Sequence, residues 1–262
     1  MNKGISFYFG FDDNVEQRAK LLKEIGFDCV ITNADKKFNK QNATIKEQIK
    51  LFKQYNFKLS SLHMRYNTKD LPYFWTKSRK GNWMEQRLIK DVKIAHKYGF
   101  PYVVTHVKGV PAEICLKRFR RVLKFCDKYN VSLAIENTEN TACFTYVFDN
   151  LIHKHLKFCY DSGHANCYNP EIDYFKLYGD KLVCVHLHDN KGINDDHTLN
   201  KYGSIDWDKV AKNLAKINYQ GNLDYEIFMF VNNNENAMDT AKLVYQQACE
   251  LEQLIEQYKN KL

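Results

Sequence analysis

Eight short apolar runs, separated by longer amphipathic segments, constrain the fold of this chain more than any other feature. The runs lie at residues 5–11, 28–33, 58–64, 102–107, 132–137, 157–162, 182–189 and 223–229. Each is rich in Val, Ile, Leu, Phe or Tyr, as expected of strands that are buried on both faces of a parallel sheet. Parallel neighbours need a crossover connection, usually a helix, so the pattern predicts eight βα units.

The segments between these runs have the spacing of amphipathic helices. In residues 14–25, Val15, Ala19 and Leu22 recur at helical intervals, and Gly26 follows as a C-terminal stop. The same pattern marks residues 84–98, 112–129, 207–217 and 237–258. Strands that alternate with helices in this way predict an α/β protein.

A closed barrel fits this pattern better than an open, doubly wound sheet. The chain has 262 residues, close to the ~250 that are typical of a (β/α)8 barrel. An open sheet would normally have fewer strands and a Gly-rich phosphate loop after the first, whereas residues 9–13 read Phe-Gly-Phe-Asp-Asp. The sequence contains no internal repeat or low-complexity linker. We therefore predict one TIM-barrel domain over residues 1–262.

The composition indicates a globular protein of the cytoplasm. No apolar run approaches the ~18 residues of a membrane span, and the first residues lack the apolar stretch of a secretory signal. The eight cysteines form no CxxC pair, which favours buried, reduced thiols. A net charge of +8 would suit an anionic partner, but the lysines are spread along the helix-like segments and indicate solvated helix faces.

Polar side chains end six consecutive strands, where the active site of such a barrel is built. They are His63, His106, Glu136, Asp161 with His164, His186 with His188 (followed by Asp195 and His197), and Glu226. Burying such groups is costly unless they are paired or bind a metal. Imidazole and carboxylate together suit Zn²⁺, Mn²⁺, Fe²⁺ or Co²⁺, and the absence of cysteine from this set argues against a structural thiolate site. The pattern predicts a catalytic metal centre.

Four stretches around these residues resemble the xylose isomerase-like TIM-barrel superfamily, particularly its sugar phosphate isomerase/epimerase branch. They read Ile-Glu-Asn-Thr at 135–138, Tyr-Asp-Ser-Gly-His-Ala-Asn at 160–166, Val-His-Leu-His-Asp-Asn-Lys-Gly at 185–192 and Gly-Ser-Ile-Asp-Trp at 203–207. The resemblance implies an enzyme of carbohydrate metabolism that isomerises or epimerises a sugar or sugar phosphate. Its metal, Mn, Mg, Co or Zn, would be held by Glu136, Asp161, His186 and Glu226. Glu136 and Glu226 would also be catalytic, moving a proton between substrate carbons.

The resemblance also suggests residues that would contact the substrate. His188 is a rival for the histidine ligand and otherwise a substrate-binding residue. Lys108 would hold a hydroxyl or a phosphate. From their position in the loop after the third strand, and not from the resemblance, we predict that Tyr66 and Trp75 form an apolar wall against a sugar ring. Enzymes of this branch are often oligomers, so a homo-oligomer is possible.

The related endonuclease IV type of abasic-site nuclease is the alternative. Such enzymes hold three zinc ions, and the additional ligands would be His63, His106, His164, Asp195 and His197. The stretch His-Met-Arg-Tyr at 63–66 resembles the corresponding nuclease segment. No Arg-rich loop is evident, so DNA is a partner only under this alternative. The stretch Leu-Asn-Lys-Tyr at 199–202 departs from the Pro-Gly-rich turn of many isomerases.

Overall fold

A computed structural model describes residues 1–10, 14–34, 43–65, 67–228 and 236–261. Its strands form one parallel sheet in the order β7-β6-β5-β4-β3-β2-β1-β8. They are β1 (Lys3–Ser6), β2 (Cys29–Asn33), β3 (Lys58–His63), β4 (Tyr102–Thr105), β5 (Ser132–Glu136), β6 (Leu156–Asp161), β7 (Leu182–His186) and β8 (Leu223–Tyr225). Each predicted run thus overlaps one observed strand, although β1 and β6 begin before their predicted runs, at Lys3 and Leu156.

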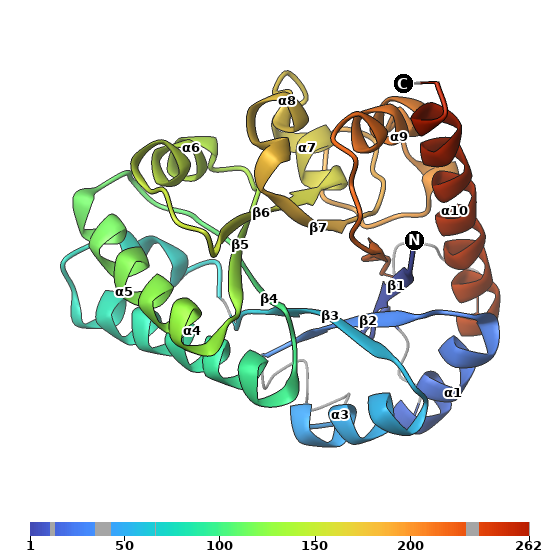
Figure 1. Ribbon diagram of the computed structural model, residues 1–262, viewed down its shortest axis with the longest axis horizontal. Coiled ribbons are helices and arrows are strands. Elements are labelled where there is room, and N and C mark those ends of the chain that lie inside the picture. Colours follow the sequence, from blue (N-terminus) through green and yellow to red (C-terminus); the bar gives the residue numbers. More distant parts are fainter. Residues whose placement is uncertain (11–13, 35–42, 66, 229–235, 262) are drawn as a thin grey trace.

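The sheet closes on itself through its first and last strands. β1 pairs with β8, with Ile5 opposite Tyr225. β7 meets β8 through Leu187, whose N–H donates to Asp224 O at 2.8 Å and whose carbonyl accepts from Glu226 N at 2.9 Å. The molecule is therefore a (β/α)8 barrel, as predicted, and Figure 1 shows its helices around the strands.

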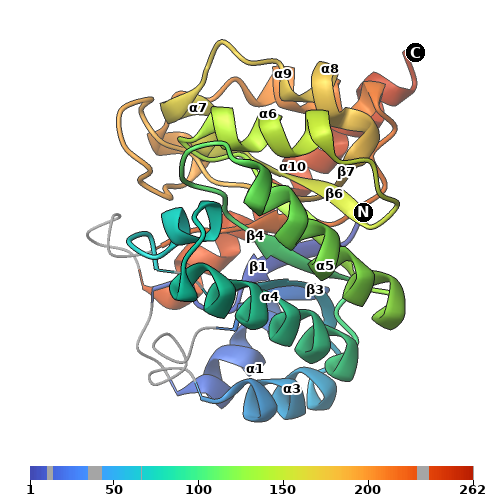
Figure 2. The same cartoon turned by 90° about the vertical axis from the view of Figure 1, so that its left-hand side faces the viewer.

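Helices cover the outside of the barrel. They are α1 (Val15–Ile25), α3 (Ile45–Gln54), α4 (Arg79–Tyr98), α5 (Glu113–Tyr129), α6 (Thr141–Asn150), α7 (Ser162–Tyr168), α8 (Tyr174–Tyr178), α9 (Trp207–Lys216) and α10 (Ala237–Lys259). Within the described residues, the connections also contain the 3-10 turns η1 (Leu71–Trp75), η2 (Gly179–Lys181) and η3 (Asn200–Tyr202). Figure 2 shows α4 and α5 side by side on the outer surface. α4 begins five residues before the predicted position of 84, because Ser78 caps it by accepting from Gly81 N.

Several predicted runs continue past the C-terminal ends of the strands that they overlap. β1 ends at Ser6 and β8 at Tyr225, while the runs continue to 11 and 229. Phe11 and Met229 lie outside the described residues. The apolar character continues past the strand ends because the first loop residues, such as Phe7, Phe9 and Ile227, also pack into the core.

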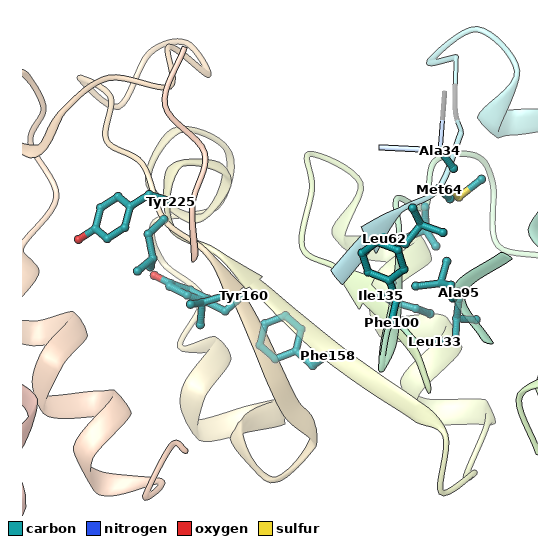
Figure 3. Packing of buried hydrophobic residues seen from close by; sticks show 14 of the residues in the cluster. Ala34, Leu62, Met64, Ala95, Phe100, Leu133, Ile135, Phe158, Tyr160 and Tyr225 are labelled. Carbon is teal, nitrogen blue, oxygen red and sulfur yellow. The ribbon is translucent and has the colours of Figure 1, made fainter. Parts of the chain in front are cut away.

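The alternation of side chains along each strand decides what faces the inside of the barrel. On β5, Leu133 and Ile135 belong to the large core beneath the helices, and Figure 3 shows them near Ala95 of α4. Ala134 faces the other way, into a small inner cluster with Val104, Cys159 and Cys184. Glu136 has the same parity as Ala134 and therefore points into the barrel.

Two further predictions concern the cysteines and the membrane. All eight cysteines, which the structure describes in full, are free thiols, and six of them are buried. Among the described helices, none has the length and hydropathy of a membrane span.

Candidate metal centre

The strand ends bring four imidazoles around one carboxylate. Glu136 Oε2 lies 3.1 Å from His106 Nε2, 3.4 Å from His63 Nε2 and 3.3 Å from His186 Nδ1. Its other oxygen, Oε1, lies 3.2 Å from His164 Nδ1. Burial alone would raise the pKa of Glu136, but the imidazoles of His106 and His186 hold that pKa well below its ordinary value. Glu136 is therefore an anion at the centre of the site.

Asp161 connects β6 to α7 and joins the same cluster. Its Oδ1 accepts from His164 N at 2.7 Å and so caps α7. Its Oδ2 lies 3.1 Å from His188 Nε2. Asn137 holds the Asp161 backbone from both sides, donating to Asp161 O at 2.9 Å and accepting from Asp161 N at 2.8 Å. Both carboxylate oxygens thus have fixed directions.

The loop after β7 supplies the third carboxylate. Asp195 Oδ2 lies 3.2 Å from both His164 Nε2 and His197 Nε2. The His197 ring stacks on that of His188, with the centroids 3.8 Å apart. Glu226 follows β8, and its Oε2 lies 3.6 Å from His186 Nδ1. The Glu226 side chain is 16% exposed, against 1% for Glu136.

Three of the histidines direct Nε2 toward the carboxylates. His63 Nδ1 faces Met64 O at 3.0 Å, His164 Nδ1 faces Asn137 O at 2.9 Å, and His197 Nδ1 faces Glu226 O at 2.7 Å. Because a carbonyl oxygen only accepts, each Nδ1 must carry a proton, which leaves Nε2 with a lone pair when the ring is neutral. Metal-binding histidines typically have this arrangement.

The donor set as a whole fits divalent cations. Groups whose ligand atoms lie within 4.8 Å of one another are His63–His106–Glu136, Asp161–His186–Glu226, Glu136–Asp161–His164, His188–Asp195–His197 and Glu136–Cys159–His186. His186 Nε2 and His188 Nδ1 are buried and make no hydrogen bond within the described part of the chain. In the described part of the chain, this cluster of four carboxylates and six imidazoles includes no Lys or Arg, so the carboxylates repel one another unless protons or cations intervene.

The remaining predicted site residues lie farther from this cluster or are not described. Lys108 pairs with Glu139 at the mouth, where both side chains are about two-fifths exposed. Trp75 is 3% exposed, and a Cβ on Gly109 would fall 2.4 Å from its indole ring. Trp75 is thus packed beneath the loop after β4. Tyr66 lies outside the described residues.

Two residues of the cluster were absent from the sequence-based set. Cys159 lies below Glu136 and His186, and its position two residues before Asp161, on the same side of the strand, could have indicated this. Asn137 directly follows Glu136, but its contacts with Asp161 and His164 depend on how β5 lies against β6. That pairing is not visible in the local sequence.

Comparisons with known proteins agree with the fold. The family model described as a xylose isomerase-like TIM barrel matches residues 19–247. The uncharacterized protein y4fM of Sinorhizobium fredii is 26% identical over 254 residues, which covers 82% of each chain.

Two solved structures superpose over nearly the whole length. A D-tagatose 3-epimerase-like protein has a TM-score of 0.78 at 19% identity, covering 98% of this chain and 99% of its own. An IolI protein with a bound zinc atom has a TM-score of 0.75 at 17% identity, again covering 98% and 99%. At these identities, the likeness establishes the shared barrel.

Proposed function

Because this chain belongs to the xylose isomerase-like TIM barrel family, we propose that it is a metal-dependent enzyme that isomerises or epimerises a sugar or sugar phosphate. One observation carries this proposal. Glu136 and Glu226 approach the same atom, His186 Nδ1, at 3.3 and 3.6 Å. Two carboxylates that converge in this way can flank a small substrate.

The ion would be held by Glu136, Asp161, His186 and Glu226. A divalent ion such as Mn²⁺, Mg²⁺, Co²⁺ or Zn²⁺ bound there would polarise the oxygen atoms of the substrate, whether carbonyl, hydroxyl or phosphate. The structures of an epimerase-like protein and a zinc-binding IolI protein, which share this barrel, support the same class of chemistry.

The protein's own groups would move the proton. Glu226, as the more exposed carboxylate, would accept a proton from a substrate carbon next to the carbonyl. A carboxyl group of the same pair would return a proton to the neighbouring carbon or to the opposite face. Lys108, at the mouth, would bind a phosphate in place of Glu139 if the substrate carries one.

A specific observation favours a second candidate, phosphodiester hydrolysis at a three-ion centre of the endonuclease IV type. His63 and His106 both face Glu136, and Asp195 lies between His164 and His197. A one-ion isomerase needs neither group as ligands. This set would suit abasic-site DNA as the substrate.

Metal content separates the two candidates. The protein would be purified without chelator and its metals counted by elemental mass spectrometry. About one Mn, Mg or Co per chain, with turnover of a ketose or ketose phosphate, would support the isomerase. Close to three zinc ions, with cleavage of abasic-site DNA, would support the nuclease. A protein that takes up no divalent metal from Zn²⁺, Mn²⁺ or Co²⁺ solutions would contradict both.

A further inference from the structure

The loop at residues 190–204, between β7 and α9, carries two of the candidate ligands, Asp195 and His197. A segment of this length has no strand or long helix to hold it in place. The positions of Asp195 and His197 at the metal centre must therefore be fixed by individual contacts between the loop and the rest of the protein. His197 contacts Glu226 O and Phe228 N directly. The contacts that join the two ends of the loop converge on Asp189, the last residue before the loop.

Asp189 is completely buried and holds the two ends of the loop together. Its Oδ1 accepts from Asn190 N at 2.8 Å at the start of the loop, and from Ser204 N at 2.9 Å and Ile205 N at 3.1 Å at the far end. Its Oδ2 accepts from Trp207 Nε1 at 2.7 Å. One carboxylate thus satisfies four donors from both sides of the loop.

The backbone of Asp189 also fixes the residue that follows His197. Asp189 and Thr198 exchange two backbone hydrogen bonds, each 2.9 Å long. The Thr198 hydroxyl donates to Asp189 O at 3.0 Å. His197 itself has a positive φ of 50°, a conformation that such neighbouring contacts must maintain.

Gly203 leaves the space that this arrangement needs. A Cβ at Gly203 would fall 1.8 Å from Asp189 Oδ1. Any larger residue would displace the carboxylate from the Ser204 and Ile205 amides. The stretch at residues 203–207 therefore complements Asp189. It leaves space for the Asp189 carboxylate and supplies two amide donors and the indole donor.

We propose that Asp189 is a positioning residue that closes the loop at 190–204 and thereby holds Asp195 and His197 against His164. Within the described residues, the carboxylate accepts hydrogen bonds from backbone amides and from Trp207, so its role is to orient the loop that carries the ligands. The consequence for metal binding rests on the proposed function, while the closing of the loop does not.

The test compares D189N with a matched control, D206N. The Asn oxygen can still accept the backbone amides, but its amino group would face the Trp207 N–H, donor against donor. Asp206 undergoes the same chemical change at an exposed position where it caps α9. The double variant D189N/W207F removes the opposing indole donor and should restore part of the loss.

Hydrogen exchange on the metal-free variants tests the closing of the loop. We expect amides in 190–206 of D189N to exchange at least ~10-fold faster than in the native protein, while β7 and β5 remain protected and D206N leaves the loop unchanged. Unchanged protection of the loop in D189N would overturn the proposal. A uniform loss of protection over all strands would overturn it as well, because it would show a general structural role.

Zinc titration then tests the consequence for the ligands. We expect D189N to bind zinc at the His188–Asp195–His197 group about 10–100-fold more weakly, with the other groups unaffected. Equal affinities for D189N and the native protein would contradict the link between the loop and the metal. A native protein that takes up none of Zn²⁺, Mn²⁺ or Co²⁺ would instead refute the proposed function, and hydrogen exchange would still decide the role of Asp189.

Discussion

Glu136 and Glu226 contact the same imidazole but differ in how far they can reach a substrate. Glu136 is 1% exposed and lies among four histidines. Glu226 is 16% exposed and lies at the open end of β8. An enclosed carboxylate has little freedom to approach a substrate carbon, so we assign the first proton transfer to Glu226.

Replacing Glu226 by Gln tests this assignment. The amide keeps the shape of the side chain but cannot accept a proton, so we expect kcat at saturating metal to fall about 10²–10⁴-fold. Sugar conversion would be followed by chromatography, with circular dichroism to show that the fold is retained. Glu171→Gln, an exposed acid away from the cluster, is the control. E226Q with nearly native kcat would refute a role in proton transfer.

His106 distinguishes the one-ion from the three-ion centre. It belongs to the His63–His106–Glu136 group, whose two histidines are ligands only in the three-ion candidate. H106A should lower the zinc content by about one ion per chain if three ions are present, because a three-ligand group loses one donor. H96A, which removes an exposed histidine on α4, is the matched control. Elemental analysis that finds equal metal in both variants would favour the one-ion centre.

The junction of β6 and α7 places Asp161 and His164 on opposite sides of a very short connection. The helix begins at Ser162, directly after the strand, because Asp161 is both the last strand residue and the helix cap. Gly163, in the first turn, lies against His188. A Cβ there would fall 1.9 Å from His188 Cε1 and 2.3 Å from Nδ1.

Gly163→Ala should therefore weaken metal binding even though alanine favours helices by up to ~1 kcal/mol. The added methyl would push His188 away from Asp161, and we expect cobalt or zinc affinity to fall about 10–100-fold. Isothermal titration would measure the affinity. An affinity equal to that of the native protein would show that the His188 ring has room to move.

Asp224 on β8 lies inside the barrel, where burial destabilises the charged form of its carboxyl group. It accepts from Ser60 Oγ and Cys29 Sγ and is completely buried. Burial raises the pKa of Asp224 to about 6, above its ordinary value of 3.8. The protonated form is thus the one that the fold favours. The contribution of protonated Asp224 to the free energy of unfolding is complete below pH 3.8 and is lost as pH rises through 6.

Asp224→Asn should remove this pH dependence. Above pH 7 we expect the variant to be more stable than the native protein by up to roughly 3 kcal/mol, with the difference vanishing near pH 4. Urea unfolding at pH 4, 6 and 8 would measure it. A difference that stays constant with pH would show that Asp224 does not titrate in this range. The control Asp180→Asn alters an exposed acid and should show no such trend.

The strands and their polar ends could be predicted because both follow from local rules. Apolar runs mark buried strands, and His63, Glu136 and Asp161 interrupt such runs at their ends. Trp75 was harder to place, since a loop aromatic can face either the mouth or the core, and here it packs beneath Gly109. Asn137 required knowledge of the β5–β6 register. Contacts between distant segments decide such cases, and the local sequence does not contain them.

Closure of the barrel brings together ligands that are far apart in the chain. His63 on β3 and Glu226 after β8 both contact the cluster around Glu136 and His186. The four carboxylates of this cluster add four negative charges in one region, where Glu136 and Asp161 are buried and Asp195 and Glu226 are partly exposed. Without cations, these charges must be offset by protonated histidines, and burial raises the free energy of such pairs. Metal binding should therefore stabilise the whole barrel.

Metal removal tests this coupling between the site and the fold. An ion that binds only the folded state at 100 times its Kd adds about 2.7 kcal/mol to the free energy of unfolding. For a chain of about this length, 1 kcal/mol corresponds to roughly 2–4 °C in Tm, so we expect EDTA to lower Tm by roughly 5–10 °C. Adding back Zn²⁺ or Mn²⁺ should restore it, whereas NaCl of equal ionic strength should not. A Tm that is insensitive to both chelator and metal would show that the clustered carboxylates and imidazoles are balanced by protons alone, and the metal-dependent function would then be wrong.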